Sequence, residues 1–313
     1  MKLWLHKHRA FIRVLTILVV IIGGAYVGAC EYFYRVAFIP SQKSFLSTKQ
    51  SASKKSAIKW LAEVPHSVWH ETAVGKPSWQ LNAWYVPAAK QTSKTIVVAH
   101  GYMNTHKDMA EYIRMFHDAG YNVLAPDDRG HGSSDGTYVG YGWADRLDYR
   151  KWLRRVVRVN GQRSDIGLFG VSMGGATVMY LSGMNLPKQV HAIVEDCGYT
   201  SVDAEISYQA GSMYNLPRWP LVPGTLTMAH LHTRIDYAAA NAVSALHRNQ
   251  LPTFFIHGAK DKFVPTTMVH QNYAASRGPK QLWVVPGAGH AQSYGKHTAE
   301  YTKRVTKFFA KHL

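Results

Sequence analysis

Cysteine and acidic residues are both scarce in this chain of 313 residues. Two cysteines, Cys30 and Cys197, exclude a disulfide-stapled scaffold and any zinc site built from cysteine alone. Only 19 aspartates and glutamates face 36 lysines and arginines, so the net charge is +17. This balance excludes an acidic solvating tail and makes an anionic partner plausible. No segment of about 20 to 50 residues recurs, which excludes solenoids and propellers, and a hydrophobic share of 46% excludes a disordered chain.

One long apolar run lies near the N-terminus. Residues 10–29 contain a single charged residue, and about 20 residues is the length that crosses a bilayer core. Because basic residues precede the run, we expect a retained signal anchor that makes this a single-pass protein of the cell membrane. The rest of the chain is expected outside the cytoplasm, since long domains are translocated largely regardless of their charge. Two alternatives stay open: cleavage after Ala29, and lipidation of Cys30 at an imperfect lipobox.

The chain divides by composition into four parts. A short basic segment (1–9) precedes the predicted span, a stalk follows (30–67), and a catalytic body fills residues 68–313. The stalk is predicted because residues 41–59 are rich in serine and lysine and poor in apolar residues, which is typical of a linker or a polar amphipathic helix rather than of core.

Strand-like and helix-like segments alternate through the body. Two β-rich segments, 68–74 and 79–86, flank a turn and predict an antiparallel hairpin. Short apolar runs then predict strands at 95–100, 121–127, 166–172, 192–197, 251–258 and 281–287. Buried strands separated by helices are typical of an α/β fold with a mostly parallel, doubly wound sheet. Residues 200–249 contain no such strand, so we expect them to form a lid over the carboxyl ends of the strands.

A nucleophile motif lies between a predicted strand and a predicted helix. The residues Gly170-Val171-Ser172-Met173-Gly174 fit the pattern G-x-S-x-G. In that context the serine occupies a sharp, strained turn, and glycine is needed on either side because larger side chains would clash. The N-terminus of the following helix favours developing negative charge. The pattern therefore predicts Ser172 as a nucleophile.

A serine nucleophile needs a base and a carboxylate that orients the base. His290 lies in a glycine-rich loop directly after one predicted strand, and Asp261 lies directly after another. Both would therefore reach the same edge of the sheet as Ser172. Glu195 and Asp196 also follow a predicted strand and are the alternative acids.

Two loops near this edge carry further candidates. An oxyanion hole needs two backbone donors, and we expect them to be the amides of Met173 and Tyr102. Asp127 and Arg129, in the next loop, are expected to tie loops together through a charge-assisted pair rather than to act in catalysis.

Taken in order, these motifs resemble the α/β-hydrolase superfamily over about residues 69–313. The segments that carry the resemblance are HGY, DDRGHGSS, GVSMGG, HGAKDKFVP and PGAGH. The chain is similar above all to bacterial membrane-anchored hydrolases of the serine aminopeptidase and esterase-like group. The resemblance implies a serine hydrolase that cleaves carboxylic esters through Ser172, His290 and Asp261, by way of an acyl-enzyme, with no metal and no organic cofactor.

Two other functions stay open. A serine aminopeptidase would use the same triad and hold a substrate ammonium with carboxylates, for which Glu195, Asp203 and Glu205 are candidates. A non-catalytic binding module on the hydrolase scaffold is a second alternative. A nucleic-acid partner is not expected, because only the net charge suggests one and no recognition motif is visible.

The lid and one basic helix suggest what the protein binds. Apolar residues are frequent between 213 and 228, and we expect some of them, among them Met213 and Trp219, to line an acyl site, although they could simply pack the lid. Arg150, Arg154 and Arg158 recur every four residues on a predicted helix. That face is either solvated or lies against an anionic lipid surface or wall polymer.

Overall fold

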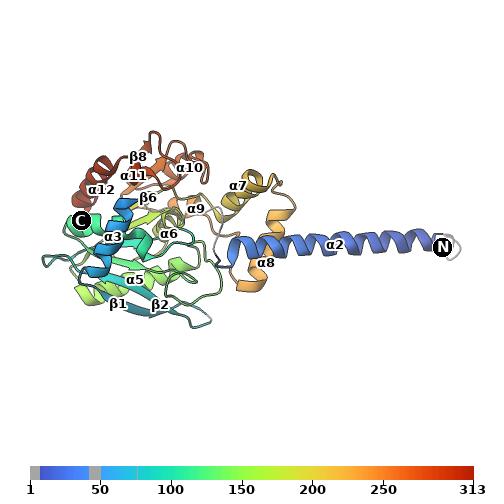
Figure 1. Ribbon diagram of the computed structural model, residues 1–313, viewed down its shortest axis with the longest axis horizontal. Coiled ribbons are helices and arrows are strands. Elements are labelled where there is room, and N and C mark those ends of the chain that lie inside the picture. Colours follow the sequence, from blue (N-terminus) through green and yellow to red (C-terminus); the bar gives the residue numbers. More distant parts are fainter. Residues whose placement is uncertain (1–7, 42–50, 76) are drawn as a thin grey trace.

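A sheet of eight strands forms the centre of the body in the computed structural model, which describes residues 8–41, 51–75 and 77–313 (Figure 1). The strands are β1 (Ser67–Thr72), β2 (Gln80–Val86), β3 (Lys94–Ala99), β4 (Asn122–Pro126), β5 (Asp165–Val171), β6 (Val190–Asp196), β7 (Thr253–Gly258) and β8 (Lys280–Val285). Their order is β1-β2-β4-β3-β5-β6-β7-β8. The β1–β2 and β2–β4 pairs are antiparallel and the others are parallel. The predicted α/β fold, with a hairpin leading into a mostly parallel sheet, is confirmed.

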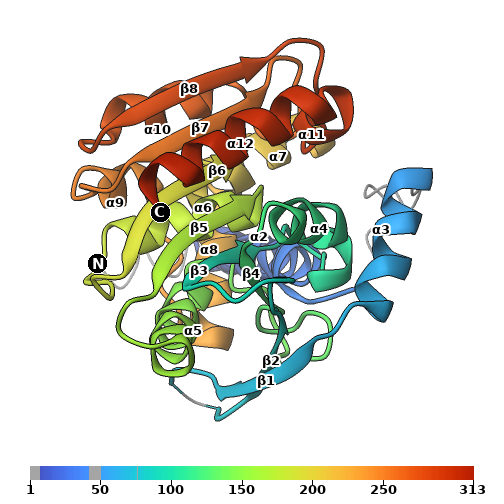
Figure 2. The same ribbon diagram turned by 90° about the vertical axis from the view of Figure 1, so that its left-hand side faces the viewer.

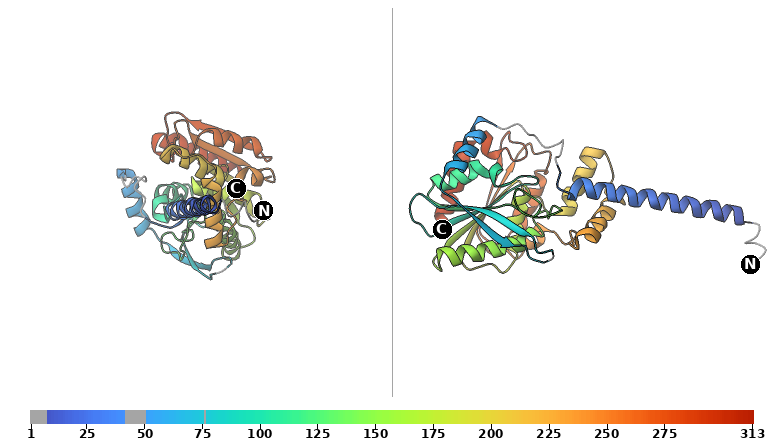
Figure 3. Two further views of the ribbon diagram at one scale, coloured as in Figure 1. Left: turned by 90° about the vertical axis from the view of Figure 1, so that its right-hand side faces the viewer. Right: turned by 60° about the horizontal axis from the view of Figure 1, so that its bottom comes forward.

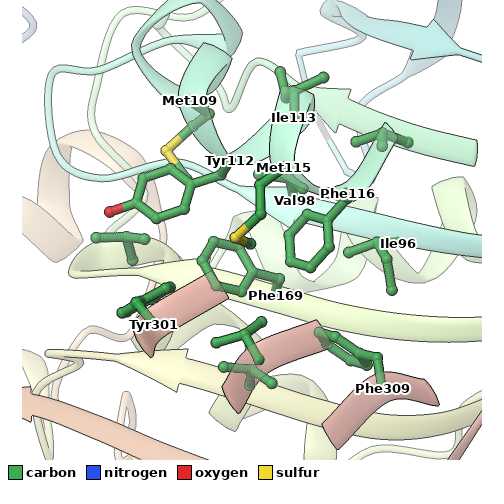
Figure 4. Packing of buried hydrophobic residues seen from close by; sticks show 14 of the residues in the cluster. Ile96, Val98, Met109, Tyr112, Ile113, Met115, Phe116, Phe169, Tyr301 and Phe309 are labelled. Carbon is green, nitrogen blue, oxygen red and sulfur yellow. The ribbon is translucent and has the colours of Figure 1, made fainter. Parts of the chain in front are cut away.

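Helices cover both faces of this sheet (Figure 2). One face carries η1 (His106–Met109), α4 (Ala110–Asp118) and α12 (Thr298–His312), and the other carries α5 (Asp145–Asn160), α6 (Met173–Ser182) and α10 (Thr267–Ala275). Tyr112 and Phe116, one helical turn apart on α4, both pack on Phe169 of β5 with ring centroids 5.1 Å away, and Phe116 also meets Phe309 of α12 (Figure 4). This packing holds α4 and α12 against β5.

The N-terminal helix α2 (Arg9–Phe38) projects from the body for most of its length (Figure 1). A window of 18 residues in it has a mean hydropathy of 2.3 and no buried residue, so the helix is long and apolar enough to cross a membrane. Its side chains from Phe11 to Val27 are largely exposed, as shown by Val20 and Ile22, each 66% exposed. Exposed aliphatic side chains in such a row need a partner other than water.

The segment predicted as a stalk is, where the structure describes it, part of the folded body. Cys30, Tyr34 and Phe38 recur every four residues along α2 and are buried. Helix α3 (Ala52–Glu63) packs on α4 through Ala57 and Leu61, which are also four residues apart and belong to the main core. Helix α3 is mostly polar and the last turns of α2 are mixed, so a narrow apolar stripe suffices to bind each of them to the body. Residues 42–50 of the predicted stalk lie outside the described residues.

The predicted lid segment folds into three helices, α7 (Val202–Tyr214), α8 (Leu221–Thr233) and α9 (Ala242–Leu246). Short helix α9 packs on α6, whereas α7 and α8 stand away from the sheet beside α2 (Figures 1 and 3). Helix α8 packs along α2, and the phenol of Tyr26 donates to the carbonyl of Pro220 at 2.9 Å. The lid is therefore built from α7, α8 and the last turns of α2 together.

Helix α5 lies on the body, away from the projecting part of α2 (Figure 1). Arg154 and Arg158 are exposed, while Lys151 and Arg155 lie 3.3 and 3.6 Å from Glu71 of β1. Contact of this face with an anionic lipid surface or wall polymer stays a hypothesis.

Candidate active site

Ser172 occupies a strained turn between β5 and α6. Its φ and ψ are 58° and −117°, a region that residues other than glycine rarely adopt. The neighbouring glycines explain how the turn fits: a Cβ on Gly170 would lie 2.1 Å from the carbonyl oxygen of Gly174, and a Cβ on Gly174 would lie 2.1 Å from that of Ala99. The turn thus requires glycine at both positions, and it places the Ser172 hydroxyl at the carboxyl edge of the sheet.

The structure brings Ser172, His290 and Asp261 together. The Ser172 Oγ lies 2.8 Å from Nε2 of His290, and Nδ1 of His290 lies 2.8 Å from Oδ2 of Asp261. The arrangement fits an imidazole whose Nδ1–H donates to Asp261 while Nε2 accepts the Ser172 hydroxyl. Each residue follows a different strand, β5, β7 or β8. The three meet because these strands run parallel in one sheet, with only β6 between β5 and β7, so their carboxyl ends reach the same edge.

Asp261 is held in the ionised form. Burial raises the pKa of its carboxyl, but hydrogen bonding to His257 and His290 outweighs burial and lowers the pKa below its usual range. The other oxygen, Oδ1, accepts the backbone amides of Phe263 and Val264, each at 2.9 Å. An ionised, fully bonded carboxylate is suited to orient an imidazole and to stabilise its cationic form.

His257 is a member of this cluster that the sequence did not assign. Its Nε2 lies 2.9 Å from the carbonyl of Val264 and 3.3 Å from Oδ2 of Asp261, so two histidines face one carboxylate oxygen. Its place at the end of a strand, four residues before Asp261, was the available signal. His257 is buried and does not contact Ser172, so we assign it a positioning role.

The two alternative acids point elsewhere. Asp196 accepts the hydroxyls of Ser293 at 3.1 Å and Tyr301 at 2.9 Å, and Glu195 accepts the amide of Gly198 at 2.9 Å. Burial raises the pKa of Asp196 to about 6 and that of Glu195 to about 8. Asp261 is therefore the carboxylate whose geometry fits His290.

The same cluster contains potential metal ligands. A ligand atom each of Cys197, Asp261 and His290 lies within 4.8 Å of the others. Burial raises the pKa of the Cys197 thiol well above its usual value, and thiol is a poor ligand compared with thiolate. Both ring nitrogens of His290 already contact other residues. This donor set fits proton transfer better than metal binding, and the expectation of no metal or cofactor stays a prediction.

Two backbone amides flank the serine as predicted oxyanion donors. Met173 is the first residue of α6, and Tyr102 follows β3 next to Gly101, where a Cβ would lie 3.6 Å from Cβ of Ser172. Among the hydrogen bonds of the described residues, neither amide donates to a protein acceptor. The backbone amide of the next residue, Met103, donates to Nε2 of His131 at 3.2 Å. The geometry therefore leaves Tyr102 and Met173 available for an oxyanion.

A largely apolar cavity opens beside Ser172. Its volume is about 100 Å³, within an open recess of about 850 Å³ that includes solvent space. Met213, Tyr214 and Val222 of the lid line it, together with Phe33 of α2. Sequence reasoning missed the contribution of α2, although the apolar character of that helix extends past residue 29.

Of the two lid residues predicted to bind substrate, only Met213 lines the cavity. Trp219 lies in the turn before α8, is 74% exposed and is not part of the cavity wall. Its indole faces outward because the turn residues precede the apolar stripe by which α8 packs. The prediction for Trp219 is therefore corrected.

Met213→Ala should change the ratio of rates on octanoyl and acetyl esters by about tenfold, because it removes several carbons from the wall. Trp219→Ala is the matched control and should leave that ratio unchanged. Steady-state kinetics with p-nitrophenyl esters would measure both. Equal ratios in the two variants would mean that Met213 only packs the lid.

One buried carboxyl, that of Glu205, lies in the cavity wall. Its Oε1 accepts the side-chain amide of Gln209 at 2.8 Å, and its Oε2 has no partner among the described residues. Burial raises the pKa of Glu205 to about 8, so the group is mostly neutral at pH 7. Asp203 instead binds Arg218 at 2.7 Å outside the cavity. Three carboxyl groups were candidates for holding a substrate ammonium, those of Glu195, Asp203 and Glu205. Of these, only Glu205 lines the cavity.

Glu205→Gln should stabilise the fold at pH 8 relative to pH 5. An acid with a raised folded-state pKa costs stability as pH rises from its unfolded value near 4.5 to about 8, since the unfolded chain ionises first. Glutamine does not titrate, so the difference from wild type should grow by roughly 1 kcal/mol per pH unit. Thermal unfolding in detergent at both pH values would measure it.

Asp203→Asn is the control for this experiment. Hydrogen bonding to Arg218 lowers the pKa of Asp203, so this carboxyl stays ionised in both states from pH 5 to 8, and its effect should not vary with pH. A pH-independent effect of Glu205→Gln would contradict the raised pKa.

Asp127 and Arg129 do tie loops together, but not to each other. Asp127 accepts the ring and the amide of His106 at 2.9 and 2.8 Å. Arg129 forms a bidentate ion pair with the carboxylate of Asp148, at 2.7 and 3.0 Å, and also donates to the carbonyl of Val74. The predicted single pair is replaced by two, because Asp127 finds its partner in η1 and Arg129 finds its partner in α5.

Comparison with known proteins identifies the family of the chain. The family model of the serine aminopeptidases, S33 (Hydrolase_4), matches residues 90–210. The protein YqkD of Bacillus subtilis (strain 168) is 30% identical over 226 residues, which cover 72% of this chain and 73% of that protein. YfhR of Escherichia coli (strain K12) is 26% identical over 245 residues, covering 74% and 77%.

Solved structures share the fold. The esterase Pf2001 of Pyrococcus furiosus superposes with a TM-score of 0.65 at 21% identity, covering 87% of this chain and 99% of that one. Acetyl xylan esterase 1 of Thermoanaerobacterium sp. JW/SL YS485 gives a TM-score of 0.55 at 14% identity, covering 81% and 92%. At these identities the likeness concerns the fold alone. Together with the sequence matches it shows that the chain belongs to the α/β hydrolases of the serine aminopeptidase S33 family.

Proposed function

We propose that this protein is a serine hydrolase that cleaves carboxylic esters. The observation that carries the proposal is the hydrogen-bonded chain from Ser172 through His290 to Asp261, with the serine in a strained turn at the mouth of an apolar cavity. Esterases among the proteins with the same fold support the reaction type. An apolar cavity suits an acyl chain better than a charged or sugar group.

The mechanism follows from the positions of these groups. Ser172 Oγ attacks the acyl carbon while His290 Nε2 takes its proton, and Asp261 stabilises the imidazolium. The Tyr102 and Met173 amides hold the oxyanion at the N-terminus of α6. The ester C–O bond breaks as His290 returns the proton to the alcohol. Water, deprotonated by His290, then releases the acid and restores Ser172.

Covalent labelling tests the proposal. The full-length protein in detergent should react with a short alkyl fluorophosphonate, and Ser172→Ala should not. Ser172→Ala keeps the backbone and removes only the nucleophile, so loss of labelling reports chemistry rather than folding. Unlabelled wild-type protein, or equal labelling of the variant, would overturn the assignment and leave a non-catalytic binding module as the better account.

A serine aminopeptidase is the second candidate, because Glu205 offers one unpartnered carboxyl oxygen inside the cavity. A substrate ammonium next to it would favour the ionised form. Rates on p-nitrophenyl acyl esters and on aminoacyl p-nitroanilides separate the two functions. Faster anilide cleavage that Glu205→Gln abolishes would favour the peptidase.

We further propose that α2 is retained as a membrane anchor with the body outside the cytoplasm. Cys30 is 2% exposed, and a Cβ on Gly224 of α8 would lie 2.4 Å from its sulfur, so lipidation would displace packed side chains. The intact mass of protein extracted from membranes should include residues 1–29. A mass that begins at Cys30 would contradict retention.

A further inference from the structure

The last turns of α2 form a wall of the substrate cavity. Phe33, Val36 and Ala37 lie on one face of the helix, at spacings of three and four residues, and all three line the cavity with Ser172. The carbonyl of Ala37 accepts the hydroxyls of Tyr102 at 2.9 Å and Tyr141 at 3.0 Å. The helix that could span a membrane is therefore bonded directly to the loops that build the catalytic edge.

The lid touches α2 at the level where a bilayer would end. The exposed apolar stretch from Phe11 to Val27 is about 25 Å long at 1.5 Å per residue, against a hydrocarbon core of about 30 Å. The hydrogen bond between Tyr26 and Pro220 attaches the lid inside the apolar run 10–29. The lid therefore meets α2 near the end of that run, at the depth where the boundary layer of a membrane around α2 would lie.

The exposed surface of the lid fits such a layer. Met213 and Tyr214 of α7 are each 40% exposed, Leu231 of α8 is 53% exposed and Trp219 is 74% exposed. Both lid helices flank α2 where it leaves the body (Figures 1 and 3). Tryptophan and tyrosine are enriched at membrane interfaces, where one end of the ring is apolar and the other is wet. Met213 and Tyr214 also line the cavity, so the exposed surface and the cavity are continuous.

We propose that the site takes a membrane-resident ester with a long acyl chain, which passes from the bilayer along α2 into the cavity; this rests on the proposed esterase function. The acyl chain would lie against Phe33, Val36 and the lid, with its carbonyl at Ser172. The tyrosine hydroxyls of Tyr102 and Tyr141 are already bonded to Ala37, so that wall is apolar toward the chain. Hydrolysis transfers the acyl group to Ser172, releases the headgroup alcohol with a proton from His290, and ends with water freeing the fatty acid.

Two Val→Phe substitutions on α2 test whether this helix forms the wall of the acyl site. Val36→Phe narrows the cavity, and it should lower the ratio of rates on dodecanoyl and acetyl p-nitrophenyl esters by about tenfold or more. Val20→Phe, on the part of α2 that projects away from the lid and at 66% exposure, should leave both rates unchanged. Both variants are studied as full-length protein in detergent, and labelling by a short fluorophosphonate verifies that the site is folded. An unchanged ratio in labelled Val36→Phe protein would overturn the proposal.

Reconstitution tests the route. The full-length protein in phosphatidylcholine vesicles should hydrolyse a fluorogenic long-chain acylglycerol placed in the same vesicles, and at least tenfold more slowly when the acylglycerol is in separate vesicles. Equal rates would mean that substrate arrives through water and would overturn the membrane route. If wild-type protein neither reacts with the fluorophosphonate nor hydrolyses acetyl esters, the proposed esterase function itself is wrong.

Discussion

Asp261→Asn is expected to lower ester turnover by about 10⁴-fold while leaving the fold intact. The asparagine cannot stabilise the imidazolium that forms when His290 takes the serine proton, and its amide would favour the wrong tautomer of the ring. Substrate binding in the apolar cavity should change little, so the loss should appear in kcat rather than in KM. Steady-state kinetics with a p-nitrophenyl ester measure both constants.

Asp196→Asn is the matched control for Asp261→Asn. Asp196 is as deeply buried and also follows a strand, but it binds Ser293 and Tyr301 rather than His290. The Asp196→Asn variant should therefore keep its ester turnover within about tenfold of wild type, and any loss would come from the broken hydrogen bonds. A larger effect at Asp196 than at Asp261 would transfer the orienting role to Asp196.

Arg129→Met is expected to lower the free energy of unfolding by about 3–5 kcal/mol, because it removes one partner of a buried ion pair. Arg129 and Asp148 are 6% and 4% exposed, and the substitution leaves Asp148 with the Val74 amide as a donor. Asp145 lies nearby, and burial raises the pKa of its carboxyl to about 6. Denaturant unfolding in mild detergent would measure the loss.

Arg154→Met is the control. Because Arg154 is exposed on α5, the same chemical change there should alter the free energy of unfolding by no more than about 0.5 kcal/mol. Equal stability of the two variants would show that the Arg129–Asp148 pair is no more favourable than an apolar contact. An intact fold with lost activity would instead suggest that the loop of Arg129 shapes the site.

The sequence predicted the parts of this protein that depend on local chemistry. The elbow at Ser172 is predictable because only glycine fits at Gly170 and Gly174 around a positive φ. Asp261 and His290 are predictable because a parallel sheet brings the loops after its strands to one edge. Two β-rich segments around a turn predicted β1 and β2, and short apolar runs predicted the other six strands. The spanning length of α2 follows from hydropathy alone.

Only the tertiary structure decided which residues meet across long stretches of chain. The sequence assigned the same weight to Met213 and Trp219, yet one lines the cavity and the other faces outward, because the path of the chain before α8 depends on packing against α2. The sequence treated residues 30–67 as a stalk, whereas the structure places Phe33 in the cavity wall. Hydrophobicity identifies what must leave water but not against which partner it packs, and that choice is made by the whole fold.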